Sequence, residues 1–490
     1  AASDVYKRQP RRQHYARLFA FAAALLSAPS FAADGENNEL LRQAKSNIVI
    51  LLADDLGWGD VGYHDPQVVT PNIDAIATHG VELDRFYVNP TCSPTRASLL
   101  TGQFSTTHGV NGPIQWHSKE GLPLEWQTLP GYLKRAGYQT HLVGKWHLGN
   151  ASTAYWPQQR GFDSFYGHLN GGVGYFDHVF SGGLDWQKDG VTLREEGYTT
   201  QLIQDAAIDL IENRSAEDEP LFLFVSFNAI HTPIEEPQDP SAEHQGRATL
   251  LNMISSLDSA VGKILDSLMQ RPWGKDTVII FASDNGGSSS KPWLIEMLIP
   301  PLRDGYSSNG VLKQGKGSVF EGGIRVPAAI WWPNKLESDE PLSEVVHIAD
   351  LLPTLLDFME LEVPNVDGRS LKGLLLEGSP LKPHPFVVAN FGSEAMIDWP
   401  WKIVREGSLP ITPEWLKSDT WYLYNIESDP SEVVDVQENF PERFERMRSN
   451  LLHMPRRESV QFSTDQSWDT FGGEETRAPW ADAATRHGGN

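Results

Sequence analysis

The chain has 490 residues, of which 40% are hydrophobic and 21% are charged, with 42 Gly and 33 Pro. This composition is ordinary for a globular protein and excludes a fibrous repeat or a wholly disordered chain. The formal net charge of −24 argues against nucleic acid or an acidic membrane as partner, because binding either one needs a basic surface. The length exceeds what one hydrophobic core usually supports, so we expect one large domain and a smaller companion.

The N-terminal segment has the order of a targeting signal. Three arginines between positions 11 and 17 precede an apolar run from Leu18 to about Ala28, and small residues follow at Ser30–Ala33. This order predicts a signal peptide over residues 1–33, with an uncertain start, and a periplasmic or secreted protein. The apolar run is too short to cross a bilayer, which takes about 20 residues. The alternative is a buried helix, but the order of basic flank, apolar core and small residues favours a signal peptide.

Continuous apolar runs predict strands that are buried on both faces of a sheet. They occupy Asn47–Ala53, Leu221–Phe227, Thr277–Ala282 and Ala328–Trp332. Apolar residues at helical spacing occupy Thr128–Ala136, Thr199–Asn213 and Ala248–Met269. Alternating strands and helices predict an α/β fold with a large, mainly parallel or mixed sheet sandwiched by helices.

Polar residues follow three of these predicted strands, at Asp54-Asp55, at His231 and at Asp284-Asn285. In a sheet of this kind, ligands bind beyond the carboxyl ends of the strands. We therefore expect these residues to meet in one functional site.

The pattern changes after about Pro385. Short strand-like runs separated by turn residues predict a small antiparallel sheet, with runs at Phe386–Ala389, Trp401–Val404 and Trp421–Ile426. Glu442–Leu452 then predicts one helix. We expect a catalytic domain over residues 34–384, and a C-terminal α+β subdomain with a polar tail over residues 385–490.

The only cysteine is Cys92, so no disulfide can form within the chain. A lone cysteine is either a buried thiol or a residue used for chemistry. Its surroundings, Cys92–Arg96 (CSPTR) followed by Ala97–Gly102 (ASLLTG), favour chemistry.

This segment resembles the type I sulfatase signature, in which Cys-x-Pro-x-Arg directs oxidation of the cysteine to formylglycine. Further motifs of the family occur in the family's order along the chain, one before Cys92 and the others after it. They are Asp54–Trp58, Gly137–Thr140, Gly144–Gly149, Ser283–Gly287, Leu423–Asn425 and Asp429–Glu432. Arg160–Asp163 and Lys316–Gly323 look closest to the arylsulfatase B type, the N-acetylgalactosamine-4-sulfatases, whereas Ser288–Leu312 departs from that group. The resemblance implies an alkaline-phosphatase-like fold and a sulfuric ester hydrolase that acts on a sulfated carbohydrate or an aryl sulfate.

The resemblance also implies a role for the modified cysteine. Hydrated formylglycine offers two hydroxyls, of which one attacks sulfur to form a covalent sulfate ester. The other collapses to the aldehyde and expels sulfate. A formylglycine-generating maturation enzyme is then a required partner.

An oxygen-rich cluster suits a hard divalent cation. Its members are Asp54, Asp55, Asp284 and Asn285, and the family implies Ca²⁺, with Mg²⁺ as the alternative and residue 92 as a further ligand. Taken singly, these residues are also typical of helix caps and turns.

By resemblance, Arg96 orients formylglycine, while Lys145 and Lys316 hold sulfate oxygens. His147 removes the proton that starts sulfate elimination, His231 protonates the leaving alcohol, and Asp284 activates the attacking hydroxyl. Three cations and a divalent metal outnumber three carboxylates, so we expect a positive pocket in this acidic chain.

Several alternatives stay open at this point. Tyr175, His178 and Trp116 either line a sugar subsite or are ordinary loop and core residues. The rival enzymatic function is a phosphonate or phosphodiester hydrolase of the same superfamily. The rival from another class is a catalytically silent binding protein on the sulfatase scaffold.

Overall fold

The structure is a computed structural model that describes residues 46–289, 306–336, 338, 340–390, 392–408 and 419–459. The predicted signal peptide, part of Ser288–Leu312 and most of the predicted polar tail lie outside these residues. The chain from Ser46 onward forms one compact unit by its internal contacts. The domain boundary at residue 385 therefore stays a prediction.

Within the described residues, a nine-stranded mixed sheet has the order β2-β12-β11-β1-β10-β4-β5-β8-β9. Its strands are β1 (Asn47–Ala53), β2 (Val81–Glu82), β4 (Gln139–Lys145), β5 (Ser164–His168), β8 (Gln187–Lys188), β9 (Val191–Thr192), β10 (Leu221–Ser226), β11 (Thr277–Ser283) and β12 (Ala328–Trp331). The five strands β11, β1, β10, β4 and β5 run parallel. Their carboxyl ends therefore share one edge of the sheet.

Strand β1 lies inside this sheet, between β11 and β10, and is buried along its whole length. Ile48, Ile50 and Leu52 belong to the hydrophobic cluster on one face. Val49 and Leu51 belong to the cluster on the other face. Because successive side chains of a strand point to opposite faces, a strand covered on both sides needs the unbroken apolar run seen in the sequence.

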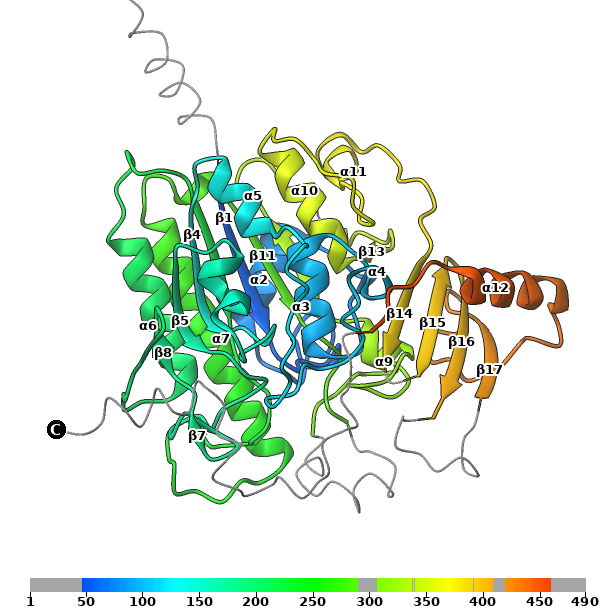
Figure 1. The fold of residues 1–490 in the computed structure, drawn as a ribbon, viewed down its shortest axis with the longest axis horizontal. Helices are drawn as coiled ribbons and strands as arrows, with labels where there is room; N and C mark the ends of the chain where they lie inside the picture. The colour runs from blue at the N-terminus through cyan, green and yellow to red at the C-terminus, as the bar shows by residue number, and fades with distance from the viewer. Residues whose placement is uncertain are drawn as a thin grey trace, which may run out of the picture. The chain divides into compact units, whose positions relative to one another are not determined.

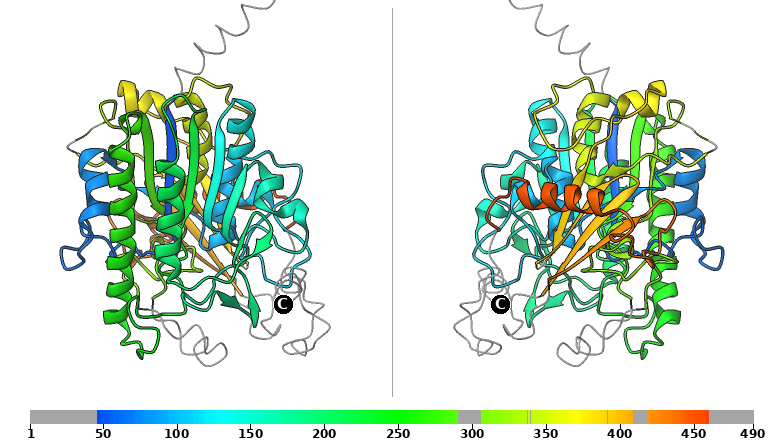
Figure 2. Two further views of the ribbon diagram at one scale, coloured as in Figure 1. Left: turned by 90° about the vertical axis from the view of Figure 1, so that its left-hand side faces the viewer. Right: turned by 90° about the vertical axis from the view of Figure 1, so that its right-hand side faces the viewer.

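Helices cover both faces of the sheet (Figures 1 and 2). One hydrophobic cluster joins β1 to residues of α3 (Cys92–Thr101), α5 (Leu129–Arg135) and α10 (Leu351–Phe358). The other joins it to residues of α2 (Pro71–His79), α6 (Thr199–Glu212) and α7 (Arg247–Met269). This sandwich confirms the predicted α/β class.

A second sheet, β14-β15-β16-β17, is antiparallel and is drawn in orange in Figure 1. Its strands are β14 (Phe386–Asn390), β15 (Ser393–Asp398), β16 (Trp401–Gly407) and β17 (Asp419–Asn425). One face packs on Met447 and Leu451 of α12 (Pro441–His453). The other face packs on Tyr87, Phe320 and Ile324, so it is joined to the main body through a hydrophobic core.

Besides several single turns of 3-10 helix, the described fold also contains short strands and helices. They are β3 (Phe86–Tyr87) paired with β13 (Val346–His347), β6 (Val179–Phe180) paired with β7 (Gly183–Leu184), and the helices α4 (Ser105–His108), α9 (Glu321–Ile324) and α11 (Lys372–Glu377).

The Ala328–Trp332 run forms the predicted strand β12, and its antiparallel pairing with β11 makes the sheet mixed, as the sequence allowed. The sequence reasoning missed β4 and β5 because polar residues and glycines interrupt their apolar pattern. It also missed β15 of the small sheet, whose acidic residues hide the alternation.

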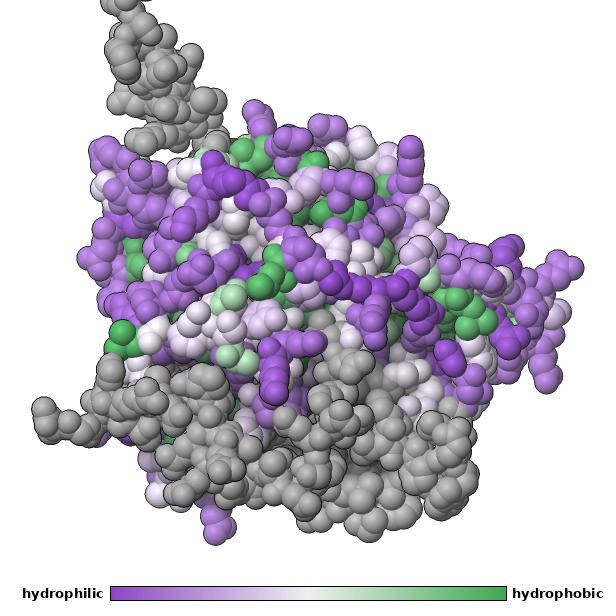
Figure 3. Space-filling model, viewed as in Figure 1, coloured by the Kyte–Doolittle hydropathy of each residue, from purple (hydrophilic) through white to green (hydrophobic). Residues whose placement is uncertain are grey.

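The described part of the face in Figure 3 is mostly hydrophilic, with small scattered hydrophobic patches. None of the helices among the described residues is both long enough and apolar enough to span a bilayer.

Candidate functional site

The candidate site lies where the parallel strands end. Asp54-Asp55 follows β1 and Asp284-Asn285 follows β11, and these strands are paired in register up to Ala53 and Ser283. Lys145 is the last residue of β4. The predicted meeting of these strand ends is confirmed by their geometry.

Three ion pairs connect the cations and carboxylates of this site, and two of them, those of Lys145 and Arg96, are fully buried. Lys145 Nζ lies 2.5 Å from Asp54 Oδ2. Lys316 Nζ lies 2.7 Å from Asp55 Oδ1. Arg96 donates from Nη2 to Asp284 Oδ2 at 2.8 Å, and from Nε to the same oxygen at 3.1 Å. Each predicted cation therefore has one predicted carboxylate as partner.

Cys92 is the first residue of α3 and is only 2% exposed. Its Sγ lies 3.6 Å from Asp54 Oδ1, and the backbone N–H groups of the first helical turn favour negative charge there. Burial, together with nearby Asp284, raises the pKa of the thiol to about 12. An unmodified thiol at this position is therefore protonated at neutral pH and is a weak nucleophile.

A set of potential metal ligands surrounds this sulfur. One ligand atom each from Asp54, Asp55, Cys92 and His231 lies within 4.8 Å of all the others. Asn285 Oδ1 is buried and has no hydrogen-bond partner among the described residues, while its Nδ2 donates to Asp55 Oδ1 at 2.8 Å. An oxygen-rich set with one unsatisfied buried oxygen fits a hard divalent cation.

Asp284 has a different local role from the other two carboxylates. Its Oδ2 accepts from Arg96, and its Oδ1 accepts from the backbone N–H of Asp55 at 3.3 Å. Burial and the neighbouring Asp54 raise its pKa, although Arg96 opposes this shift. For Asp55, burial also favours a higher pKa, but Lys316 and His231 outweigh it and the pKa falls below its usual range.

The two predicted catalytic histidines face the same loop. A Cβ built on Gly171 would lie 2.7 Å from His147 Cε1, and one on Gly172 would lie 2.9 Å from His231 Nδ1. Neither position has room for a side chain. Sequence reasoning missed this glycine pair, whose only signal was two adjacent glycines after an unrecognised strand.

Both imidazoles are held by a backbone carbonyl. His147 Nε2 contacts Ile114 O at 3.0 Å and leaves a buried Nδ1 without a partner among the described residues. His231 Nδ1 contacts Thr232 O at 2.6 Å. Burial and nearby cations lower the pKa of His147 well below its ordinary value, and burial with Lys316 lowers that of His231 to about 3. Both rings are therefore neutral in this arrangement.

Two site residues have left-handed backbone conformations, Asp55 with φ 63° and His147 with φ 58°. Such conformations are uncommon for residues other than glycine and often occur at functional sites. Ser226, at the end of β10, accepts a hydrogen bond from Arg96 Nη1. The sequence reasoning did not single out this serine because it appeared only as the end of an apolar run.

The suggested sugar-subsite residues lie mainly in the interior. Tyr175 is fully buried and donates to the carbonyls of Asn228 and His231 at 3.0 and 2.9 Å. His178 stacks on Trp186 and contacts Gly197 O. These two are core and loop-supporting residues. Trp116 is partly exposed, and its carbonyl accepts from Asn150.

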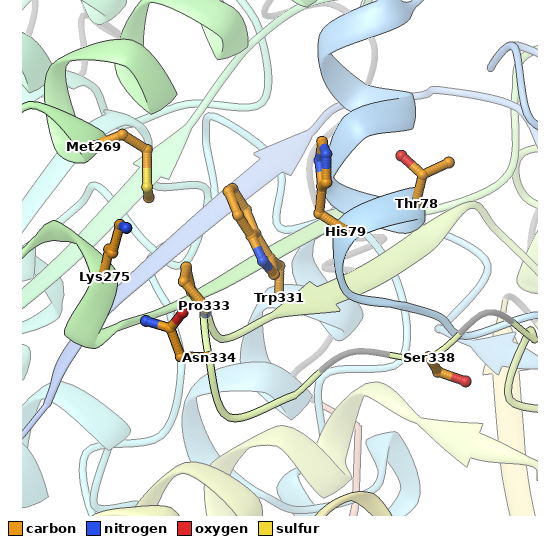
Figure 4. Close-up of a pocket in the computed structure, with 8 residues that line it drawn as sticks. All are labelled: Thr78, His79, Met269, Lys275, Trp331, Pro333, Asn334 and Ser338. Carbon is orange, nitrogen blue, oxygen red and sulfur yellow. The ribbon is translucent and has the colours of Figure 1, made fainter.

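A separate hollow of about 330 Å³ lies near the opposite edge of the main sheet (Figure 4). His79, Lys275 and Trp331 are among its lining residues. The lining shares no residue with the ion-pair cluster around Cys92.

Comparison with known proteins identifies the family. The family model described as Sulfatase matches residues 46–361. A second model, described as N-sulphoglucosamine sulphohydrolase, C-terminal, matches residues 314–456.

Relatives and solved structures agree with this match. Rattus norvegicus N-acetylgalactosamine-6-sulfatase is 36% identical over 358 residues, which are 68% of this chain and 66% of that protein. The chain thus spans slightly less than two thirds of that relative. Homo sapiens arylsulfatase A is 34% identical over 68% of its length and 67% of this chain.

The crystal structure of Ps i-CgsB in complex with k-i-k-neocarrahexaose has a TM-score of 0.73 at 27% identity, covering 90% of this chain and 99% of that chain. The finer likeness to N-acetylgalactosamine-4-sulfatases stays a prediction. The family model, the relatives and the shared fold together show that this chain belongs to the type I sulfatase family.

Proposed function

We propose that this protein is a sulfatase that removes sulfate from a sulfated carbohydrate, with formylglycine made from Cys92 and Ca²⁺ as its metal. The observation that carries the proposal is the cluster of Arg96, Lys145 and Lys316 with three carboxylates around the Cys92 side chain. Its relatives include N-acetylgalactosamine-6-sulfatases, and Ps i-CgsB was solved with a carbohydrate. Because other relatives are named arylsulfatases, aryl sulfates are a second candidate substrate class for this protein.

A sulfate ester resists hydrolysis because its sulfur is shielded by oxygens and its alkoxide leaves poorly. Catalysis needs a strong nucleophile, positive charge on the sulfate oxygens and a proton for the leaving oxygen. Lys145 and Lys316 neutralise the sulfate oxygens, and Arg96 orients residue 92. Hydrated formylglycine supplies a geminal diol, of which one hydroxyl attacks sulfur and the other permits release of sulfate.

The remaining residues act on protons and on the metal. Asp284 accepts the proton of the attacking hydroxyl, and His147 removes the proton that starts sulfate elimination. His231 helps to protonate the leaving alcohol, a role that requires the negative charge of bound sulfate to raise its lowered pKa. Asp54, Asp55, Asp284 and Asn285 would hold Ca²⁺ together with residue 92, and the ion would polarise sulfate and lower the pKa of the attacking hydroxyl.

The CSPTR segment makes a formylglycine-generating enzyme the partner that matures Cys92. The order of residues 1–33 supports a periplasmic or secreted location.

The test is to produce the protein with a formylglycine-generating enzyme, to measure conversion of Cys92 by peptide mass spectrometry, and to assay defined sulfated oligosaccharides and an aryl sulfate. Phosphate and phosphonate esters are assayed in parallel. We expect turnover of sulfate esters that scales with the converted fraction. Turnover of phosphorus esters alone would favour the phosphohydrolase alternative, and full conversion without turnover of any ester would favour a silent binding protein.

A further inference from the structure

Lys316 lies on a loop without regular secondary structure, whose backbone the main body holds from one side: Lys316 N–H donates to Gly287 O at 3.1 Å, and Gly317 N–H donates to Pro90 O at 2.7 Å. Lys145 ends a central strand, but residues 313–320 form turns and bends with glycine on both sides of Lys316. Gly317 has φ 84°, a conformation that favours glycine. A loop of this kind needs outside contacts to hold a cation 2.7 Å from Asp55.

The small C-terminal sheet contacts this loop directly beside Lys316. Asn390, the last residue of β14, donates from Nδ2 to Gly317 O at 2.7 Å. The Asn390 side chain is buried, and its Oδ1 has no hydrogen-bond partner among the described residues. Among those residues, the hydrogen bonding of this side chain is therefore directed at the Lys316 loop.

The sheet also holds the loop before Lys316. Lys313 Nζ donates to Tyr424 Oη at 3.2 Å and to Glu432 O at 3.0 Å. The same ammonium lies 4.1 Å from the centre of the Phe320 ring. A cation over an aromatic face is attracted to it, so these contacts restrain the loop at this end.

A buried charge cluster holds the loop after Lys316. Lys402 of β16 lies 2.9 Å from Glu321 Oε1 and 2.9 Å from Glu432 Oε1. Glu321 also donates its backbone N–H to Glu432 Oε2 at 2.6 Å. All three side chains are fully buried, and breaking such a buried pair is strongly destabilising.

We infer that the C-terminal sheet positions the Lys316 ammonium in the sulfate site, with Asn390 as the positioning residue nearest to it. This inference rests on the proposed function, in which Lys316 holds a sulfate oxygen. It gives the small sheet a part in sulfate binding even though Asn390 acts only through the loop backbone.

The decisive variant is Asn390→Ala, which removes the donor to Gly317 O. We expect kcat/KM for a sulfate ester to fall about tenfold, because small displacements of a positioning group have large kinetic effects. The inhibition constant of inorganic sulfate should rise in parallel. Tyr424→Phe, which keeps the ring but removes the hydroxyl near Lys313, should shift both constants in the same direction by a smaller factor.

The matched control is Asn425→Ala, at the end of β17 in the same sheet. Asn425 Oδ1 accepts from Ser428 in the sheet's own turn, so this change should leave the sulfate inhibition constant as in the wild type. A double-mutant cycle adds Asn390→Ala to Lys316→Ala, and the second change should have little further effect if Asn390 acts through Lys316.

Equal sulfate inhibition constants for Asn390→Ala and Asn425→Ala would overturn the inference, as would additive losses in the cycle. If fully converted wild-type protein hydrolyses no sulfate ester, the proposed function fails. The crystal structure of Asn390→Ala then tests whether Asn390 positions the Lys316 ammonium. Displacement of Lys316 Nζ from Asp55 supports the inference, and an unchanged ion pair overturns it.

Discussion

Two clusters of buried charge in this protein look alike but differ in their charge balance and in the side chains that lie beside them. The site cluster pairs Lys145, Lys316 and Arg96 with Asp54, Asp55 and Asp284. The junction cluster, between the main body and the small sheet, consists of Lys402, Glu321 and Glu432. Both are closely paired, so burial and pairing alone do not identify a functional site.

The site cluster has three cations for three carboxylates, so a bound divalent cation makes it positive and suited to an anion. It also contains Cys92, the proposed precursor of the nucleophile, and two buried atoms, Asn285 Oδ1 and His147 Nδ1, that have no hydrogen-bond partner among the described residues. The junction cluster has two carboxylates for one lysine and no nucleophile. Glu432 Oε1 of the junction cluster also has no hydrogen bond among the described residues, although it lies 2.9 Å from Lys402 Nζ. The balanced charge and the potential metal ligands beside Cys92 therefore distinguish the site, whereas the junction cluster serves as a structural link.

The largest expected effect comes from Cys92→Ala, which removes the side chain that we propose is converted into the nucleophile. We expect turnover to fall at least about 10³-fold, as for nucleophiles in other enzymes. The melting temperature should change little, since the side chain is small and, among the described residues, the thiol makes a single long hydrogen bond at 3.6 Å. Turnover is measured on a sulfate ester. Hydrolysis by this variant at near the wild-type rate would contradict the assignment of residue 92 as the nucleophile.

Asp284→Ala should lose both activity and metal if Asp284 is, as proposed, a metal ligand and the base for the attacking hydroxyl. It also leaves Arg96 buried without its partner, at a cost of about 3–5 kcal/mol in unfolding free energy. Metal content is measured by elemental analysis, and stability by denaturant unfolding.

The matched control for Asp284→Ala is Lys402→Met in the junction cluster. It leaves two carboxylates unpaired and should destabilise the protein by a similar amount while keeping full metal content. Full metal occupancy in Asp284→Ala would contradict the ligand role of Asp284.

Metal removal should affect the site cluster reversibly. Chelation with EDTA should abolish turnover and lower stability by about 3 kcal/mol relative to protein in a hundredfold excess of Ca²⁺ over its dissociation constant. Added Ca²⁺ should restore both, as measured by thermal unfolding and rate. Asp284→Ala should show no such response, and chelation that leaves the wild-type rate unchanged would exclude the metal.

The smallest expected effect is a pH dependence of the junction cluster. Burial, with help from Glu321, raises the pKa of Glu432 from 4.5 to about 7, although Lys402 opposes this shift. Lys313 and Tyr87 also face the cluster. Because the folded pKa is raised, the stabilising contribution of Glu432 is present below pH 4.5 and is lost as the pH rises toward 7.

Glu432→Gln should remove that dependence. Unfolding free energies measured at pH 5 and pH 7 should show the wild type losing about 1 kcal/mol more per pH unit than the variant. Parallel pH curves for the two proteins would show that Glu432 does not titrate in this window.

The sequence was most informative where burial imposes a strong pattern. Strands β1, β10 and β11 were predicted within one residue of their observed ends because both faces are covered and nearly every residue must be apolar. Strand β4 was missed because Gln139, Thr140 and His141 interrupt its pattern, although it places Lys145 in the site. Local pattern could not reveal a strand whose assignment depends on its neighbours in the sheet.

The sequence by itself determined the α/β class, the family motifs and the identity of the residues that gather around position 92. Only the tertiary structure decided which carboxylate pairs with which cation, that Gly171 and Gly172 lie against both histidines, and that Asn390 reaches the loop of Lys316. The physical reason is range: strand and helix patterns reflect local geometry, whereas these contacts join residues tens to hundreds of positions apart and exist only once the sheets are packed.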